Sequence, residues 1–247
     1  MVFDQTTILV GIALLVAAYV KGIAALGFPL IATPMVALLL DIRTAVTILI
    51  IPNILMDLTQ ILRGSFPVAI FQRFSWLLLS TVAGVFLGTE VLVALPIWTL
   101  NLALGIMVLA FVLSSLLRLD FQISPQMEKI VSPLVGLISG FLNGMTNVLG
   151  PVLAVYLYSL KLPKTEFIKS IATIFIVAKL SQLIAVSTWN LFTPSNLRLS
   201  LGVTLFILLG FYAGLKTQDR IDQRTFNRAL LLFLSAMGVT LIVRSLS

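Results

Sequence analysis

Long apolar segments follow one another along the whole chain, and they constrain its fold more than any other feature. Stretches near residues 70 to 94, 96 to 117 and 167 to 188 can each cross a bilayer as an α-helix, which takes about 20 residues. Hydrophobic residues make up 60% of the 247 and charged residues 10%, whereas a soluble domain is about 45–50% apolar. The sequence therefore predicts an all-α polytopic membrane protein.

Two missing residue types narrow the function. The sequence contains no cysteine, which excludes disulfides and thiolate metal sites. It contains no histidine, so the usual proton shuttle, the commonest metal ligand and the base of most hydrolases are absent. We therefore expect no metal and no cofactor. The net charge of +7 reflects loop orientation in a membrane protein, so we expect no nucleic-acid partner.

Each half of the chain predicts about five apolar segments. In the first half they lie near residues 6 to 20, 29 to 40, 44 to 62, 70 to 94 and 96 to 117. In the second half they lie near residues 130 to 142, 150 to 160, 167 to 188, 195 to 214 and 226 to 243. The first two of each half are shorter than a span. Each short pair is one kinked helix, a re-entrant hairpin or two short crossing helices, which gives eight to ten segments.

Basic residues indicate the sidedness of the loops. With ten crossings and the N-terminus outside, only Arg43, Arg198 and Arg244 lie outside. The inner side then holds twelve basic residues: Lys21, Arg63, Arg73, Arg118, Lys129, Lys161, Lys164, Lys169, Lys216, Arg220, Arg224 and Arg228. Re-entrant hairpins give the same sidedness, whereas kinked crossings divide the charges more evenly. The positive-inside rule therefore predicts both termini outside.

An internal repeat divides the chain into two halves of opposite orientation. An odd number of crossings in each half inverts the second half relative to the first. At an offset of 122 residues the matches include Gly22 with Gly144, Pro29 with Pro151, Gln60 with Gln182 and Gly88 with Gly210. We therefore predict a first transmembrane repeat at 1–118, a polar cytoplasmic linker at 119–129 and a second repeat at 130–247.

Two stretches with helix-breaking residues occupy matching places in these halves. They are Lys21 to Pro29 (KGIAALGFP) and Asn143 to Pro151 (NGMTNVLGP). Proline suits the first turn of a helix, and a helix start inside the membrane favours an anion. The predicted substrate-binding residues are Lys21, Gly22, Gly27, Phe28, Pro29, Asn143, Gly144, Thr146, Asn147, Gly150, Pro151, Lys179 and Gln182. The alternative is that both stretches are only kinks and that Lys21 extends to the headgroups.

Two charged residues, Asp57 and Lys179, lie well inside predicted spans and at the same repeat position. Ionisable residues there are functional candidates. Asn53, Asp57 and Gln60 share one helix face through their spacing, and they form a predicted coupling or polar network. In this hypothesis Lys179 attracts an anion, while Asp57 takes up a proton or pairs with Lys179. The alternative is a static buried pair that orients two helices.

The broken stretches and their flanks resemble a known family. The segments VKGIAALGFPLIATP and GFLNGMTNVLGPVLAVYLYSLKLPKTEFIKSIATIF are similar to the two signature regions of the sulfite exporter TauE/SafE family. This resemblance covers nearly the whole chain. It implies outward movement of small sulfur-containing anions, such as sulfite and organosulfonates, across a bacterial inner membrane. It also implies that Lys21 to Pro29 and Asn143 to Pro151 are the binding loops.

The sequence thus predicts a secondary transporter that exports a small anion by alternating access, with proton coupling through Asp57 as a hypothesis. No glycine-rich phosphate cradle occurs in the chain, so ATP drive within it is not predicted. The alternatives are an anion channel, a passive membrane protein, or a membrane-embedded enzyme, although we predict no enzyme. The expected partners are the small anion and the lipid bilayer.

Overall fold

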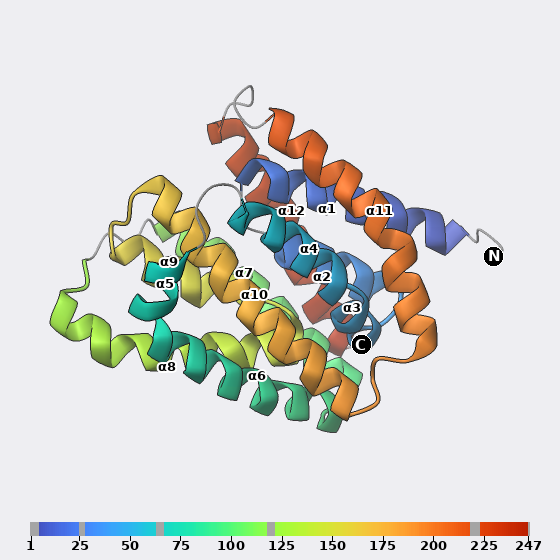
Figure 1. Ribbon diagram of the computed structural model, residues 1–247. Helices are drawn as coiled ribbons and strands as arrows, with labels where there is room; N and C mark the ends of the chain where they lie inside the picture. The colour runs from blue at the N-terminus through green and yellow to red at the C-terminus, as the bar shows by residue number, and fades with distance from the viewer. Residues whose placement is uncertain (1–4, 25–27, 63–66, 118–121, 218–222, 247) are drawn as a thin grey trace. The chain divides into compact units, whose positions relative to one another are not determined.

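The computed structural model describes residues 5–24, 28–62, 67–117, 122–217 and 223–246 (Figure 1), and their regular secondary structure is helical. The helices are α1 (Gln5–Ala24), α2 (Phe28–Leu39), α3 (Ile42–Ile48), α4 (Ile50–Ile61), α5 (Val68–Arg73), α6 (Ser75–Ala94), α7 (Ile97–Leu117), α8 (Pro125–Thr146), α9 (Gly150–Ser159), α10 (Lys164–Thr188), α11 (Pro194–Thr217) and α12 (Gln223–Leu246). The all-α prediction is confirmed. Gly27, Arg63, Arg118, Arg220 and the first residues of the predicted linker lie outside the described residues.

Several helices have the length and composition of membrane spans. Within the described residues they are Ile42–Ile61, Ser75–Ala94, Ile97–Leu117, Thr165–Thr188 and Pro194–Thr217. Shorter apolar helices cover Leu9–Ile23, Phe28–Leu39 and Leu230–Leu246. These lengths support the prediction of a polytopic membrane protein.

The first helix of each half is longer than its short apolar run. Helix α1 has 20 residues and α8 has 22, because polar turns extend both helices beyond their apolar runs. Ser124 caps α8 by accepting a hydrogen bond from the Met127 N–H, and Glu128 lies in the first turn. Both features stabilise a helix start. The second element of each half is short as predicted, with 12 residues in α2 and 10 in α9.

The predicted span at 44 to 62 is interrupted between α3 and α4. Pro52 has no N–H, so the carbonyl of Ile48, four residues earlier, cannot receive the usual helical hydrogen bond. The Ser200 hydroxyl of α11 donates to this Ile48 oxygen instead, at 2.7 Å. The interruption at Leu49 therefore leaves no cost from an unsatisfied Ile48 carbonyl.

The chain forms two compact units, and each takes segments from both sequence halves. Unit 1 comprises residues 1–52, 96–112 and 192–247, and unit 2 comprises residues 53–95 and 113–191. Helix α1 packs along α11 in unit 1, and α8 packs along α6 in unit 2 (Figure 1). An offset of 122 residues relates α1 to α8 and α6 to α11, so the two packed pairs correspond. The division into inverted repeats stays a prediction that this correspondence supports.

Glycines allow close backbone contact in both packed pairs. A Cβ atom on Gly22 of α1 would overlap the Phe211 carbonyl oxygen of α11. A Cβ atom on Gly144 of α8 would overlap the Val85 carbonyl oxygen of α6. Small residues at helix contacts are typical of membrane bundles. Gly22 and Gly144, both predicted to bind substrate, therefore lie in helix-packing contacts.

Candidate functional site

The stretch from Asn143 to Pro151 is a helix break in unit 2. Helix α8 ends at Asn147, which has a left-handed backbone with φ 67° and donates its N–H to the Asn143 carbonyl at 2.7 Å. Asparagine tolerates this conformation better than most residues. Helix α9 then begins at Gly150 with a proline in its first turn and with Leu149 as an N-cap that makes no side-chain hydrogen bond. The predicted helix start at Pro151 is confirmed to within one residue.

Lys179 of α10 reaches the end of α8. Its Nζ donates to Asn143 Oδ1 at 2.7 Å, to Gln182 Oε1 at 2.7 Å and to Asn147 Oδ1. The side chain is fully buried. An ammonium has three N–H groups to donate whereas a neutral amine has two, so these three acceptors fit the charged form. We call Asn143, Asn147, Lys179 and Gln182 the Lys179 cluster.

A second set of hydrogen bonds holds the amides of the Lys179 cluster in place. Gln182 Nε2 donates to the Asn143 backbone carbonyl at 2.8 Å, and Asn143 Nδ2 lies 3.4 Å from Gln182 Oε1. Gln182 therefore contacts both Lys179 and the last turn of α8. This arrangement fixes α10 against the helix break, so the ammonium lies at a defined place.

The electrostatics of the Lys179 cluster favour a negatively charged ligand. Its three amide side chains are neutral, so the four side chains together carry one positive charge. The C-terminal end of α8 carries partial negative charge and stabilises the ammonium. Charge-assisted hydrogen bonds to the amide oxygens offset part of the cost of burial. The Lys179 ammonium is thus held on neutral amide oxygens at the end of α8.

The other predicted residues of the second break have structural contacts. Thr146 donates its hydroxyl to the Leu142 carbonyl at 2.8 Å, within α8. Gly150 and Pro151 form the first turn of α9. These residues therefore have roles in the helices on either side of the break, whereas Asn143 and Asn147 belong to the Lys179 cluster.

The predicted residues of the first break lie in unit 1. Lys21 occupies the last turn of α1 and is 2% exposed, which argues against the alternative in which it extends to the headgroups. Phe28 and Pro29 are buried in the first turn of α2, so the predicted helix start at Pro29 is confirmed to within one residue. Gly27 lies outside the described residues.

The predicted polar network lies on α4. Asn53, Asp57 and Gln60 are buried, with exposed fractions of 0%, 1% and 5%, as their shared helix face predicts. The candidate spans that carry Asp57 and Lys179 are 67% and 61% buried, more than the other candidate spans of the described chain. Both charges therefore belong to interior helices. The ion pair between Asp57 and Lys179 stays a prediction.

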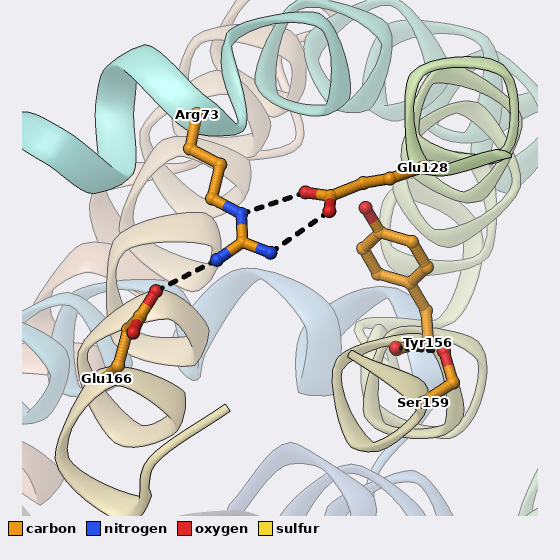
Figure 2. Close-up of polar contacts among 5 residues, drawn as sticks. All are labelled: Arg73, Glu128, Tyr156, Ser159 and Glu166. Atoms are coloured by element: carbon orange, nitrogen blue, oxygen red, sulfur yellow. Dashed lines mark hydrogen bonds and ion pairs between the residues drawn. The ribbon is translucent and has the colours of Figure 1, made fainter. Parts of the chain in front are cut away.

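A second polar cluster in unit 2 escaped the sequence analysis. Arg73, at the end of α5, donates from Nε and Nη2 to the two carboxylate oxygens of Glu128 at 2.9 and 3.0 Å, and from Nη1 to Glu166 at 3.1 Å (Figure 2). We call these three residues the Arg73 cluster. The hydrogen bonds that Arg73 donates to Glu128 raise the pKa of Arg73 above its ordinary value. Glu128 and Glu166 lie in the first turns of α8 and α10. Acidic residues are favoured there, and this preference is the sequence feature that could have drawn attention to them.

Membrane-spanning helices and two matching helix breaks, each with a buried lysine beside it, are features that membrane transporters share. A family model described as Sulfite exporter TauE/SafE matches residues 9–241, and the chain belongs to this family. The comparisons with curated proteins and with solved structures gave no match. The protein is thus an integral membrane protein of a transporter family, and the family resemblance of its sequence is confirmed.

Proposed function

We propose that this protein exports a small oxyanion, sulfite or an organosulfonate, and that the Lys179 cluster is its binding site. The observation that carries the proposal is the buried Lys179 ammonium on three carboxamide oxygens beside a helix break. The family supports sulfite-type anions as the substrate class. The substrate, the direction and the mechanism are parts of this proposal.

The chemistry of the Lys179 cluster suits an oxyanion because each carboxamide has an oxygen that accepts hydrogen bonds and an NH2 group that donates them. A sulfite or sulfonate oxygen replaces an amide oxygen at the ammonium, and the displaced amide can then donate its N–H groups to the anion. Asn147 is the best placed to turn, since it ends α8 in a left-handed conformation rather than within a helical turn. The uncapped first turn of α9 supplies further donors close to it in the chain.

Alternating access and proton coupling complete the proposal. The corresponding pairs α1 with α11 and α8 with α6 pack backbone to backbone, so each pair moves as a rigid body. Asp57 is buried inside an interior helix, where a proton can be gained or lost during the cycle. A proton entering as the anion leaves would drive export.

Flux of radiolabelled sulfite in proteoliposomes tests the proposal. We expect protein-dependent flux that Lys179→Met abolishes, since this substitution removes the charge with little change in volume. Lys169→Met, on the same helix, is the matched control and should retain flux. The proposal is wrong if Lys179→Met, folded by size-exclusion chromatography, transports at the rate of the unmodified protein.

A proton gradient separates a coupled transporter from a channel. A coupled transporter accumulates sulfite against its gradient when a pH difference is imposed, and a protonophore collapses that accumulation. Asp57→Asn should remove the accumulation but retain exchange of sulfite for sulfite. Downhill flux that is insensitive to the pH difference would contradict coupling and indicate an anion channel.

A further inference from the structure

Helix α8 carries a polar stripe between the Arg73 cluster and the Lys179 cluster. Glu128, Ser132, Ser139 and Asn143 are separated by four, seven and four residues, so they lie on one face of the helix. Ser132, Ser139 and Asn143 are 6%, 0% and 0% exposed. Asn143 lies 15 residues after Glu128, a rise of about 22 Å at 1.5 Å per residue. The stripe therefore connects a partly exposed ionic group with a buried cation inside unit 2.

Both glutamates of the Arg73 cluster are followed, one turn deeper, by a buried serine. Ser132 lies four residues after Glu128 on α8, and Ser170 lies four residues after Glu166 on α10. Ser170 is fully buried. Tyr156 of α9 joins them, because its hydroxyl points towards the Glu128 carboxylate (Figure 2). Buried hydroxyls from three helices thus lie behind the Arg73 cluster.

Several of these hydroxyls are unsatisfied. Ser139 Oγ, Ser170 Oγ and the Tyr156 hydroxyl are buried without a hydrogen-bond partner among the described residues. Ser132 lies beside the Tyr156 hydroxyl. Burying such groups without partners is unfavourable, because they lose their hydrogen bonds to water. Water or a polar ligand that reaches this face would recover that cost.

The other faces of α8 show that the polar stripe is a distinct surface. Gly136 and Gly140 lie on the face that packs against the α6 backbone. Leu134 and Ile138 are exposed, at 57% and 49%, and they point to the side opposite the stripe. One face of α8 is therefore packed against α6 and another is apolar and exposed, while the polar stripe is a third, buried surface that ends at the contacts of Asn143 with α10.

We propose that the polar stripe of α8 is a water-accessible path to Lys179, and that the Arg73 cluster closes the end of this path that lies away from Lys179. The path rests on the proposed function in one respect, namely that the small oxyanion uses it to reach the Lys179 cluster. The hydroxyls of Ser132, Ser139 and Tyr156 donate to the anion in turn. To open this end, Arg73 releases Glu128 or Glu166, and its guanidinium can then bind the anion.

Cysteine accessibility tests the path cleanly, since the chain has no cysteine of its own. Ser132→Cys and Ser139→Cys are nearly isosteric, and Ile138→Cys is the control on the exposed apolar face. The probe is sulfonatoethyl methanethiosulfonate, itself a small sulfonate, applied to proteoliposomes. Only an ionised thiol in water reacts readily, so we expect Ser139→Cys to react on the order of tenfold faster than Ile138→Cys. Adding Arg73→Ala should increase the Ser139→Cys rate further.

The result that overturns the path is an unreactive Ser139→Cys, both with Arg73 and with Arg73→Ala, in protein that is folded by size-exclusion chromatography. If sulfite binding still required Lys179 in that case, the path would fail while the proposed function stood. If Ser139→Cys reacted but no variant bound sulfite, the proposed function would fail while the water path stood. Slower labelling of Ser139→Cys in the presence of ethanesulfonate, an organosulfonate that does not react with the probe, supports both.

Discussion

The two helix breaks share their packing but differ in their chemistry. Gly22 at the first break and Gly144 at the second occupy the same repeat position, and a Cβ atom on either would overlap a carbonyl oxygen of a neighbouring helix. At the next position back the two breaks differ, since Lys21 stands where the second has Asn143. Asn147 corresponds to Ala25, which lies outside the described residues. Only the second break supplies amides, and its amides hold Lys179.

This difference separates residues that build the fold from residues that bind a ligand. Glycine and proline make both helix breaks possible, so their presence does not indicate which of the two breaks binds the anion. Amide and ammonium groups do the binding chemistry, and in unit 2 they come from two helices. The comparison predicts that substitutions of the glycines damage both units, whereas substitutions of polar residues change anion binding mainly at the second break.

The largest effect should come from adding a methyl group at the shared glycines. Gly22→Ala and Gly144→Ala each force apart two packed backbones, and overpacking costs about 1–3 kcal/mol or more. We expect a clear loss of folded yield and a lower thermal unfolding temperature in detergent for both. Gly11→Ala is the control, because no atom lies within 4 Å of its added Cβ. Equal stability of Gly11→Ala and Gly22→Ala would contradict the packing role.

The next largest effect should be on sulfite affinity, and it should differ between the lysines of the two breaks. Lys179→Met removes the charge of the cluster, so sulfite affinity should fall at least about tenfold, which corresponds to 1.4 kcal/mol. Lys21→Met should cause a smaller loss. Thermal-shift titration with sulfite on purified protein gives both affinities. A larger loss for Lys21→Met than for Lys179→Met would move the binding site to the first break.

A smaller effect should appear at the left-handed end of α8. Asn147→Gly suits the φ of 67°, so we expect unfolding stability within about 1 kcal/mol of the unmodified protein. Asn147→Val places a β-branched residue in the left-handed region, which costs roughly 1–2 kcal/mol. Thermal unfolding in detergent compares the two. If Asn147→Val were as stable as Asn147→Gly, the backbone of this break would not be fixed as described.

The smallest effect should be at the Arg73 cluster. Arg73→Lys loses the two-pronged contact with Glu128, but partly exposed ion pairs contribute only about 0–1 kcal/mol. The raised pKa of Arg73 means that its contribution is present below the ordinary arginine pKa and is lost only as the pH rises above it. Unfolding of the unmodified protein between pH 7 and 10 should therefore show no loss from Arg73. A steep loss in this interval that Arg73→Lys removes would contradict the assignment.

Much of the fold could be predicted because membrane spans follow from apolar length. The predicted segments agree with the helices, with two kinds of exception. Polar turns lengthen α1 and α8, and the segments predicted at 44 to 62 and 70 to 94 are each divided into two helices, α3 with α4 and α5 with α6. The interruption at Leu49 could have been predicted from Pro52, but the compensating bond from Ser200 joins residues far apart in the sequence. Such a partner depends on tertiary packing and has no local signal.

The candidate site could be predicted only in part, because the sequence indicates its residues but not their hydrogen-bond partners. Burial, spacing or a break predicts each member of the Lys179 cluster, and the structure places its three amides within hydrogen-bonding distance of Lys179. The sequence predicts the asparagines as hydrogen-bond donors to an anion. It does not indicate that their side-chain oxygens accept hydrogen bonds from Lys179. The Arg73 cluster escaped prediction because its members lie on three helices and each alone has the appearance of a loop charge.

Sulfite affinity of Asn147→Asp, measured beside Asn147→Gly, tests the central claim most directly. The aspartate retains the oxygen that faces Lys179 but adds a negative charge, so the four side chains of the cluster become neutral while the lysine remains. We predict that Asn147→Asp loses sulfite binding, whereas Asn147→Gly, which retains the positive charge, still binds with reduced affinity. Unchanged sulfite affinity in a folded Asn147→Asp protein would contradict the assignment of the Lys179 cluster as the anion site.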